Sequence, residues 1–126
     1  MIVVADTTPI NYLVLIGYSS VLRDLFQRVI LPRAVFQELQ SPPAPDEIRA
    51  WCTSMPDWCR VESVKTVPAE LMHLGAGERE AIALTEQLRA DLLLIAMRRV
   101  ADVQLVSVGY RSPVRLAYLI RRLLWD

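Results

Sequence analysis

Near its N-terminus the chain reads Ile-Val-Val-Ala-Asp-Thr-Thr-Pro-Ile-Asn over residues 2–11. The first four of these residues are all apolar and rich in β-branched side chains, which is typical of a strand buried on both faces of a parallel sheet. The run ends in the carboxylate of Asp6. Thr7 or Thr8 then offers a hydroxyl to cap a helix, and Pro9 suits a first helical turn. The stretch therefore predicts a strand, an acid and a helix in immediate succession.

Two interpretations of Asp6 follow from this position. In open α/β sheets, ligand and catalytic sites form outside the carboxyl ends of the strands, where Asp6 is expected to lie. The N-terminus of the following helix also favours negative charge. Asp6 is therefore either a member of a site, or only a solvated strand-end residue or helix cap.

The rest of the chain continues the alternation of apolar strands and amphipathic helices. Strands are predicted over 29–31, 61–67, 92–95 and 104–108, and helices over 10–17, 19–26, 32–39, 46–54, 78–90, 98–102 and from 112 onward. This order predicts an α/β fold, a three-layer α/β/α sandwich with a mostly parallel central sheet. At 126 residues, the chain is expected to form a single domain over 1–126.

Composition narrows the class of protein further. A hydrophobic fraction of 53% is sufficient for a core and too high for a disordered chain. The two cysteines, Cys52 and Cys59, have no histidine or further cysteine nearby to complete a zinc site, and suit a chain with reduced thiols. Neither a signal peptide nor a membrane-spanning run is evident. We therefore expect a cytoplasmic protein that does not associate with membranes.

Charge is distributed unevenly along the chain. Residues 97–126 hold six basic and two acidic side chains, whereas residues 1–96 hold eight basic and twelve acidic ones. The basic part suits either an anion such as RNA, an acidic partner, or an ordinary arginine-bearing helix face. The last predicted helix also carries more apolar surface than one small core can cover, which suits a partner or a homodimer.

Two glutamates are candidates to join Asp6. Glu38 lies on the third predicted helix, and Glu78 opens the helix predicted over 78–90. Each also has an ordinary explanation, because glutamates commonly face solvent and acids favour the first helical turn. Three converging carboxylates would repel strongly, so they would have to take up protons or bind a cation. Oxygen ligands without histidine or cysteine favour Mg²⁺ or Mn²⁺, which lowers the pKa of water and stabilises phosphoryl charge, and so favours phosphodiester hydrolysis.

Three segments together resemble the PIN-domain family, in particular its bacterial subgroup with VapC-type toxins. They are Val4–Ile10 with Leu13, Leu31-Pro32 with Val35 and Glu38-Leu39, and Leu74–Glu78 with Ala81–Leu84. The resemblance implies a metal-dependent endoribonuclease that acts on RNA in a toxin–antitoxin system, with an antitoxin protein as partner.

The resemblance also assigns roles to individual residues. It implies that three acids, Asp6, Glu38 and Glu78, are catalytic residues and ligands of Mg²⁺ or Mn²⁺. Further matches are Thr7 and Thr8, at the hydroxyl-bearing position after the first acid, and Ser107, near the end of the last strand.

One departure from the family pattern concerns a fourth acidic position. Family members usually have one or two aspartates after the strand that matches 92–95, and this chain has Ala96 and Met97. Asp91 lies at the wrong end of that strand, and Asp102 is several residues further on. We therefore expect weaker metal affinity and reduced or absent turnover.

Two functions remain open from the sequence. One is a ribonuclease with impaired catalysis, in which Arg98 and Arg99 either contact phosphates or are simply solvated. The other is a catalytically degenerate module that binds a partner protein or RNA. A small α/β protein with unrelated ligand chemistry is a third interpretation, which separation of Asp6, Glu38 and Glu78 in space would favour.

Overall fold

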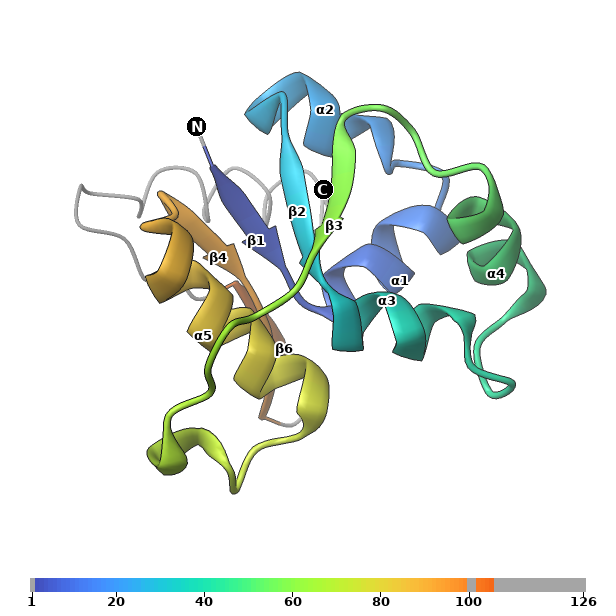
Figure 1. Ribbon diagram of the computed structural model, residues 1–126. Coiled ribbons are helices and arrows are strands. Elements are labelled where there is room, and N and C mark those ends of the chain that lie inside the picture. Colours follow the sequence, from blue (N-terminus) through green and yellow to red (C-terminus); the bar gives the residue numbers. More distant parts are fainter. Residues whose placement is uncertain (1, 100–101, 106–126) are drawn as a thin grey trace.

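A computed structural model describes residues 2–99 and 102–105, with side chains up to Ile95 (Figure 1). The elements in chain order are β1 (Val3–Ala5), α1 (Thr7–Leu15), α2 (Ser20–Phe26), β2 (Val29–Pro32), α3 (Arg33–Gln40), α4 (Asp46–Thr53), β3 (Cys59–Glu62), the 3₁₀ helix η1 (Ala69–Leu71), α5 (Ala76–Leu88), β4 (Leu92–Leu94), β5 (Ala96–Arg99) and β6 (Asp102–Leu105).

The central sheet has four parallel strands in the order β3-β2-β1-β4. The predicted buried strand, β1, lies between β2 and β4, with Val3 in register with both Val29 and Leu92. The ladder with β4 extends one residue further, because the backbone N–H of Asp6 donates to the carbonyl oxygen of Leu94 at 2.9 Å. Asp6 is thereby fixed at the carboxyl edge of the sheet.

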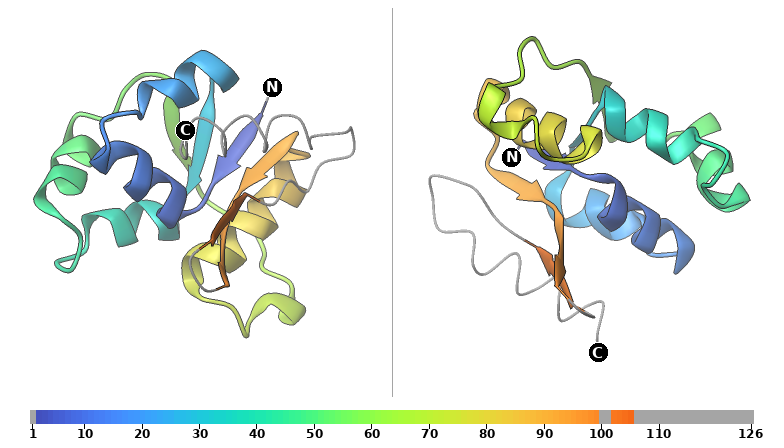
Figure 2. Two further views of the ribbon diagram at one scale, coloured as in Figure 1. Left: turned by 180° about the vertical axis from the view of Figure 1, so that it is seen from behind. Right: turned by 90° about the horizontal axis from the view of Figure 1, so that it is seen from below.

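Both faces of the sheet are buried by helices. Val3 and Ala5 belong to a cluster of buried side chains that also includes side chains from α1, α2, α3 and α4. Val4 faces the other way and packs with Ala81 and Leu84 of α5. Figure 2 shows α5 (yellow) on one side of the sheet and α1 (blue) and α4 (green) on the other. The predicted three-layer α/β/α sandwich is confirmed.

Of the capping residues that the sequence offers for the helix after β1, the structure uses Asp6. Asp6, and not Thr7 or Thr8, is the N-cap residue of α1, with an extended backbone at φ −83° and ψ 173°. Aspartate is as effective a cap as threonine, and it comes first in the sequence. At the other end of α1, Gly17 adopts a positive φ of 78°, which fits the predicted stop at this glycine.

The strand predicted over 61–67 is wrong in extent, because β3 is Cys59–Glu62. Its partner β2 ends at Pro32, which is paired with Glu62 and has no N–H to continue a ladder.

The short basic helix predicted over 98–102 is also wrong. β5 and β6 form an antiparallel pair in which Arg99 is in register with Asp102 and Met97 with Gln104. The pairing satisfies backbone groups that four or five residues of helix would leave mostly unbonded. The strand predicted over 104–108 coincides with β6 at 104–105, and the helix predicted from 112 lies outside the described residues. Within the part that the structure describes, no helix is both long enough and apolar enough to span a membrane.

Candidate functional site

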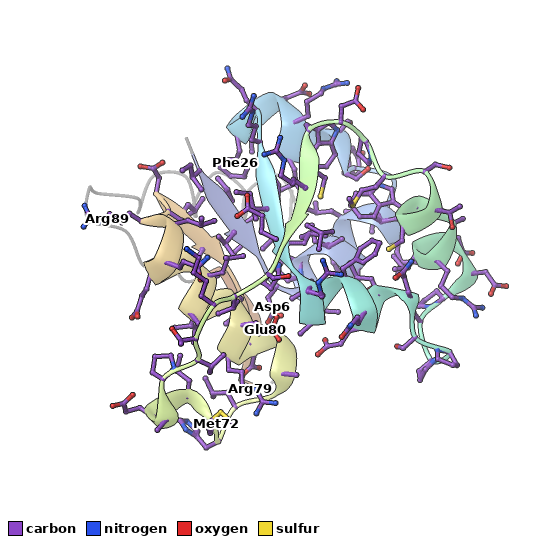
Figure 3. The ribbon with its side chains drawn as sticks, in the orientation of Figure 1. Asp6, Phe26, Met72, Arg79, Glu80 and Arg89 are labelled. Carbon is purple, nitrogen blue, oxygen red and sulfur yellow. The ribbon has the colours of Figure 1, made fainter. Side chains whose placement is uncertain are left out.

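Asp6 is buried at the carboxyl end of β1, with 5% of its surface exposed. Its backbone is held by Leu94, and its Oδ1 accepts a hydrogen bond of 2.8 Å from the backbone N–H of Thr7. Figure 3 shows its position at the lower edge of the sheet, where α5 approaches. The chain therefore places a carboxylate at low solvent exposure at the edge where α/β folds usually form their sites.

Glu38 is brought to the same place by α3. Its Oε2 accepts a hydrogen bond of 2.6 Å from the hydroxyl of Thr7, and its Oε1 accepts one of 3.1 Å from the backbone N–H of Gly77. The side chain is exposed overall, but both of its oxygens are held. Thr7 on α1 and Gly77 on α5 thus fix the direction in which the Glu38 carboxylate points.

Gly77 marks the point at which the two carboxylates converge. A Cβ atom at this position would lie 2.9 Å from Glu38 Oε1 and 3.1 Å from Asp6 Oδ1. Carbon–oxygen contacts this short are rarely tolerated, so only a residue without a side chain leaves both carboxylates in place. Asp6 and Glu38 therefore face one small volume above the first turn of α5.

The pKa of Asp6 reflects its burial and the two neighbouring acids. Burial is the main cause that raises the pKa of Asp6 from its ordinary value of 3.8 to about 6, and the Thr7 N–H acts in the opposite direction. The negative charges of Glu38 and Glu78 raise the pKa further. Both predicted glutamates thus act on Asp6, and none of these causes is a positive charge that would compensate its ionised form.

The three acids do not contribute equally to this site. Asp6 and Glu38 converge at Gly77, whereas Glu78, half-buried in the first turn of α5, is linked to Asp6 by its charge. Among the side chains described up to Ile95, no three acids, histidines or cysteines gather closely enough to hold a metal ion. The geometry is thus that of a close pair of carboxylates with a third nearby.

Two residues of this region, Glu80 and Gly77, have roles that the sequence did not reveal. Glu80 Oε1 accepts a hydrogen bond of 3.2 Å from the backbone N–H of Ala34 in the first turn of α3. The N-cap residues of these helices, Pro32 for α3 and Gly75 for α5, provide no side-chain hydrogen bond. Proline and glycine at these two positions are the feature of the sequence that could have indicated these roles. Neither side chain can accept a hydrogen bond, so the first N–H groups of both helices need acceptors from elsewhere.

Apart from Thr7, the other residues that the sequence assigns to the site make no hydrogen bond with the three acids in the part of the chain whose side chains are described. Thr8 is exposed on α1. Ala96 and Met97 begin β5, which starts two residues after the end of β4, and Arg98 and Arg99 complete it. Ser107 lies outside the described residues. Because neither alanine nor methionine carries a carboxylate, the positions that follow β4 add no acid to the site.

Comparison with known proteins gives one match. A family model described as a PIN domain matches residues 2–108, which is most of the chain. The matched residues include β1 and β4, which hold the backbone of Asp6, and α3 and α5, which carry Glu38 and Glu78. No curated protein and no solved structure matches the chain.

Proposed function

Because the chain belongs to the PIN-domain family, we propose that it is a divalent-metal-dependent endoribonuclease of the toxin–antitoxin type, with Asp6, Glu38 and Glu78 as its catalytic acids. The observation that carries the proposal is the convergence of the Asp6 and Glu38 carboxylates on Gly77. A buried acid beside a second acid is costly unless something positive joins them. The proposal implies RNA as substrate, an antitoxin protein and a second copy of the chain as partners, and a cytoplasmic location.

The residues present fit a hard divalent cation. The donors are carboxylate oxygens alone, which favours Mg²⁺ or Mn²⁺ over metals that prefer nitrogen or sulfur. Burial is the main cause of the raised pKa of Asp6, and the negative charges of Glu38 and Glu78, which a cation would compensate, raise it further. When bound, such an ion supplies the activation of water and the neutralisation of phosphoryl charge that phosphodiester hydrolysis requires.

Each side chain has a defined task in this scheme. Asp6 and Glu38 would hold the ion, and Glu78 would add a third carboxylate. The hydroxyl of Thr7 and the N–H of Gly77 already orient both oxygens of Glu38. Burial of Asp6 keeps water from competing for its carboxylate and strengthens its interaction with any cation. We further propose that Arg98 and Arg99 contact RNA phosphates.

The second candidate function is a module that keeps the fold and binds a partner protein or RNA without cleaving it. Ala96 and Met97 favour it, because they occupy positions that usually carry acids in this family. With three carboxylates, one ion is held with fewer protein ligands and a second ion is poorly held. The two candidates therefore differ in turnover, and they share the fold and the location of the site.

Cleavage of labelled single-stranded RNA by the purified protein tests the proposal. We expect slow cleavage with Mn²⁺ or Mg²⁺, none with EDTA, and a loss of about 100-fold or more in Asp6→Asn. Ala96→Asp is expected to raise the rate, because it restores a carboxylate after β4.

The outcomes separate the two functions. Cleavage only after Ala96→Asp would identify a degenerate site on an intact scaffold. If neither the wild type nor Ala96→Asp cleaves RNA, the nuclease proposal is wrong for this substrate, and the binding module is favoured. Cleavage that persists in Asp6→Asn would indicate a contaminating nuclease or another site.

A further inference from the structure

Helices α3 and α5 cap one another. Glu80 of α5 accepts a hydrogen bond from the N–H of Ala34, the second residue of α3. Glu38 of α3 accepts one from the N–H of Gly77, the second residue of α5. Each helix therefore supplies the acceptor that the first turn of the other lacks. We call this pair of hydrogen bonds the reciprocal cap.

The need for both acceptors follows from burial. The first N–H groups of a helix have no partner within the helix, and Ala34 and Gly77 are both buried. A buried N–H without an acceptor is costly because water cannot replace the missing partner. Glutamate carboxylates also interact favourably with the positive ends of the helices. The reciprocal cap is thus the device that holds these two helix N-termini in contact.

The spacing makes the reciprocal cap a clamp with two points. Ala34 and Glu38 are four residues apart on α3, so they lie on one face and are separated by about 6 Å along the axis. Gly77 and Glu80 are three residues apart on α5 and also share a face. The two hydrogen bonds therefore fix the relative position of α3 and α5. One of them fixes the carboxylate that faces Asp6.

We propose that Glu80 is a positioning residue for the carboxylate pair: by holding the start of α3 against α5, it keeps Glu38 directed toward Gly77 and Asp6. Glu80 does not touch the metal or the RNA in this scheme. It acts through the Ala34 N–H and through the helix that carries Glu38. The inference rests on the proposed function for its consequence in metal binding, and on the two hydrogen bonds for the positioning itself.

The test compares Glu80→Ala, Glu80→Gln and Glu86→Ala in the full chain. Glutamine keeps an oxygen acceptor at position 80, and Glu86 is an exposed acid on the same helix. In metal-free protein, Glu80→Ala is expected to shift the NMR amide resonances of both Ala34 and Gly77 and to speed hydrogen exchange at Gly77 about tenfold. Glu80→Gln is expected to retain most of the wild-type behaviour, and Glu86→Ala all of it.

The second measurement is Mn²⁺ affinity by calorimetry. We expect a loss of about tenfold in Glu80→Ala, partial rescue by Glu80→Gln, and no change in Glu86→Ala, because residues that orient metal ligands have effects of this size. A change at Ala34 without one at Gly77, or equal effects of Glu80→Ala and Glu86→Ala, would overturn the positioning role. Absence of Mn²⁺ binding by the wild type would refute the proposed function. In that case the amide resonance and hydrogen exchange of Gly77 in metal-free Glu80→Ala would still test the positioning role of Glu80.

Discussion

In metal-free protein at neutral pH, Asp6→Asn is expected to raise the free energy of unfolding by about 3 kcal/mol. The reason is that burial, with Glu38 and Glu78, raises the pKa of Asp6 from 3.8 to about 6. Asparagine removes the buried charge and keeps a side-chain oxygen to accept from the N–H of Thr7, and it caps helices as well as aspartate does. A substitution that abolishes the proposed activity should therefore stabilise the fold.

The gain in the free energy of unfolding in Asp6→Asn should depend on pH. Folded Asp6 binds its proton more tightly than unfolded Asp6, so the folded protein loses stability as the pH rises from about 4 to about 6. The advantage of Asp6→Asn should be absent well below pH 3.8, grow over the same interval and reach its full size above about pH 6. Urea unfolding in EDTA at pH 4 and pH 7.5 measures it. Asp57→Asn, which changes an exposed acid, is the matched control. An advantage that does not change with pH would contradict the prediction.

Addition of metal should reduce or remove the difference in the free energy of unfolding between Asp6→Asn and the wild type. A cation that binds only the folded wild type at a hundredfold excess over its Kd adds about 2.7 kcal/mol. Asp6→Asn lacks one of the two converging carboxylates and should gain little. If Mn²⁺ stabilises the wild type and Asp6→Asn to the same extent, the metal does not bind at Asp6. The paired measurements thus distinguish a metal-binding acid from an acid that merely caps α1.

The central sheet could be predicted because its signal is local. Strands buried on both faces must be apolar throughout, and Val3–Ala5 and Leu92–Leu94 are. The same runs fix where the strands end, and therefore place Asp6 at the carboxyl edge. The boundary predicted between residues 31 and 32 lies within one residue of the observed one, because Pro32 ends β2 and is the N-cap residue of α3.

The β5–β6 hairpin could not be predicted in the same way. Arg98 and Arg99 open the predicted helix over 98–102, and a strand of four residues is too short to show a periodicity that would correct this prediction. What stabilises it is the pairing with Asp102–Leu105. Pairing partners are a property of tertiary structure, and nothing in the composition of either strand specifies them.

The proximity of Asp6 and Glu38 could be expected from the residue types and their places in the predicted elements, whereas the contacts that hold them could not. Asp6 and Glu38 were expected to meet, and the structure brings them to one point. The reason that they meet lies in hydrogen bonds between elements: the Thr7 hydroxyl and the Gly77 N–H donate to Glu38, and the Ala34 N–H donates to Glu80. These contacts join residues 31 to 46 positions apart, which no helical or strand periodicity relates.

Gly77→Ala is expected to separate the stability of the fold from the integrity of the site. The new Cβ would lie 2.9 Å from Glu38 Oε1 and 3.1 Å from Asp6 Oδ1, so the carboxylates must move apart. The Glu38 carboxylate lies at the end of a long, exposed side chain and can rotate away. This rotation breaks its hydrogen bond with the Gly77 N–H. Alanine also favours a helix over glycine by up to about 1 kcal/mol. This gain offsets part of the cost of leaving the buried Gly77 N–H without its acceptor, so we expect the free energy of unfolding to fall by no more than about 2 kcal/mol.

Metal binding should respond very differently to the same substitution. With the Glu38 carboxylate displaced from Asp6, Mn²⁺ affinity is expected to fall about 10- to 100-fold, and RNA cleavage with it. Gly75→Ala is the matched control, because a Cβ there meets nothing within 4 Å and the residue precedes the same helix. Its Mn²⁺ affinity should equal that of the wild type. Equal metal affinity in Gly77→Ala and Gly75→Ala would show that the convergence of Asp6 and Glu38 on Gly77 is not where the metal binds. A loss confined to Gly77→Ala would locate the ion within a few ångströms of that glycine, because its methyl group contacts no other charged side chain as closely.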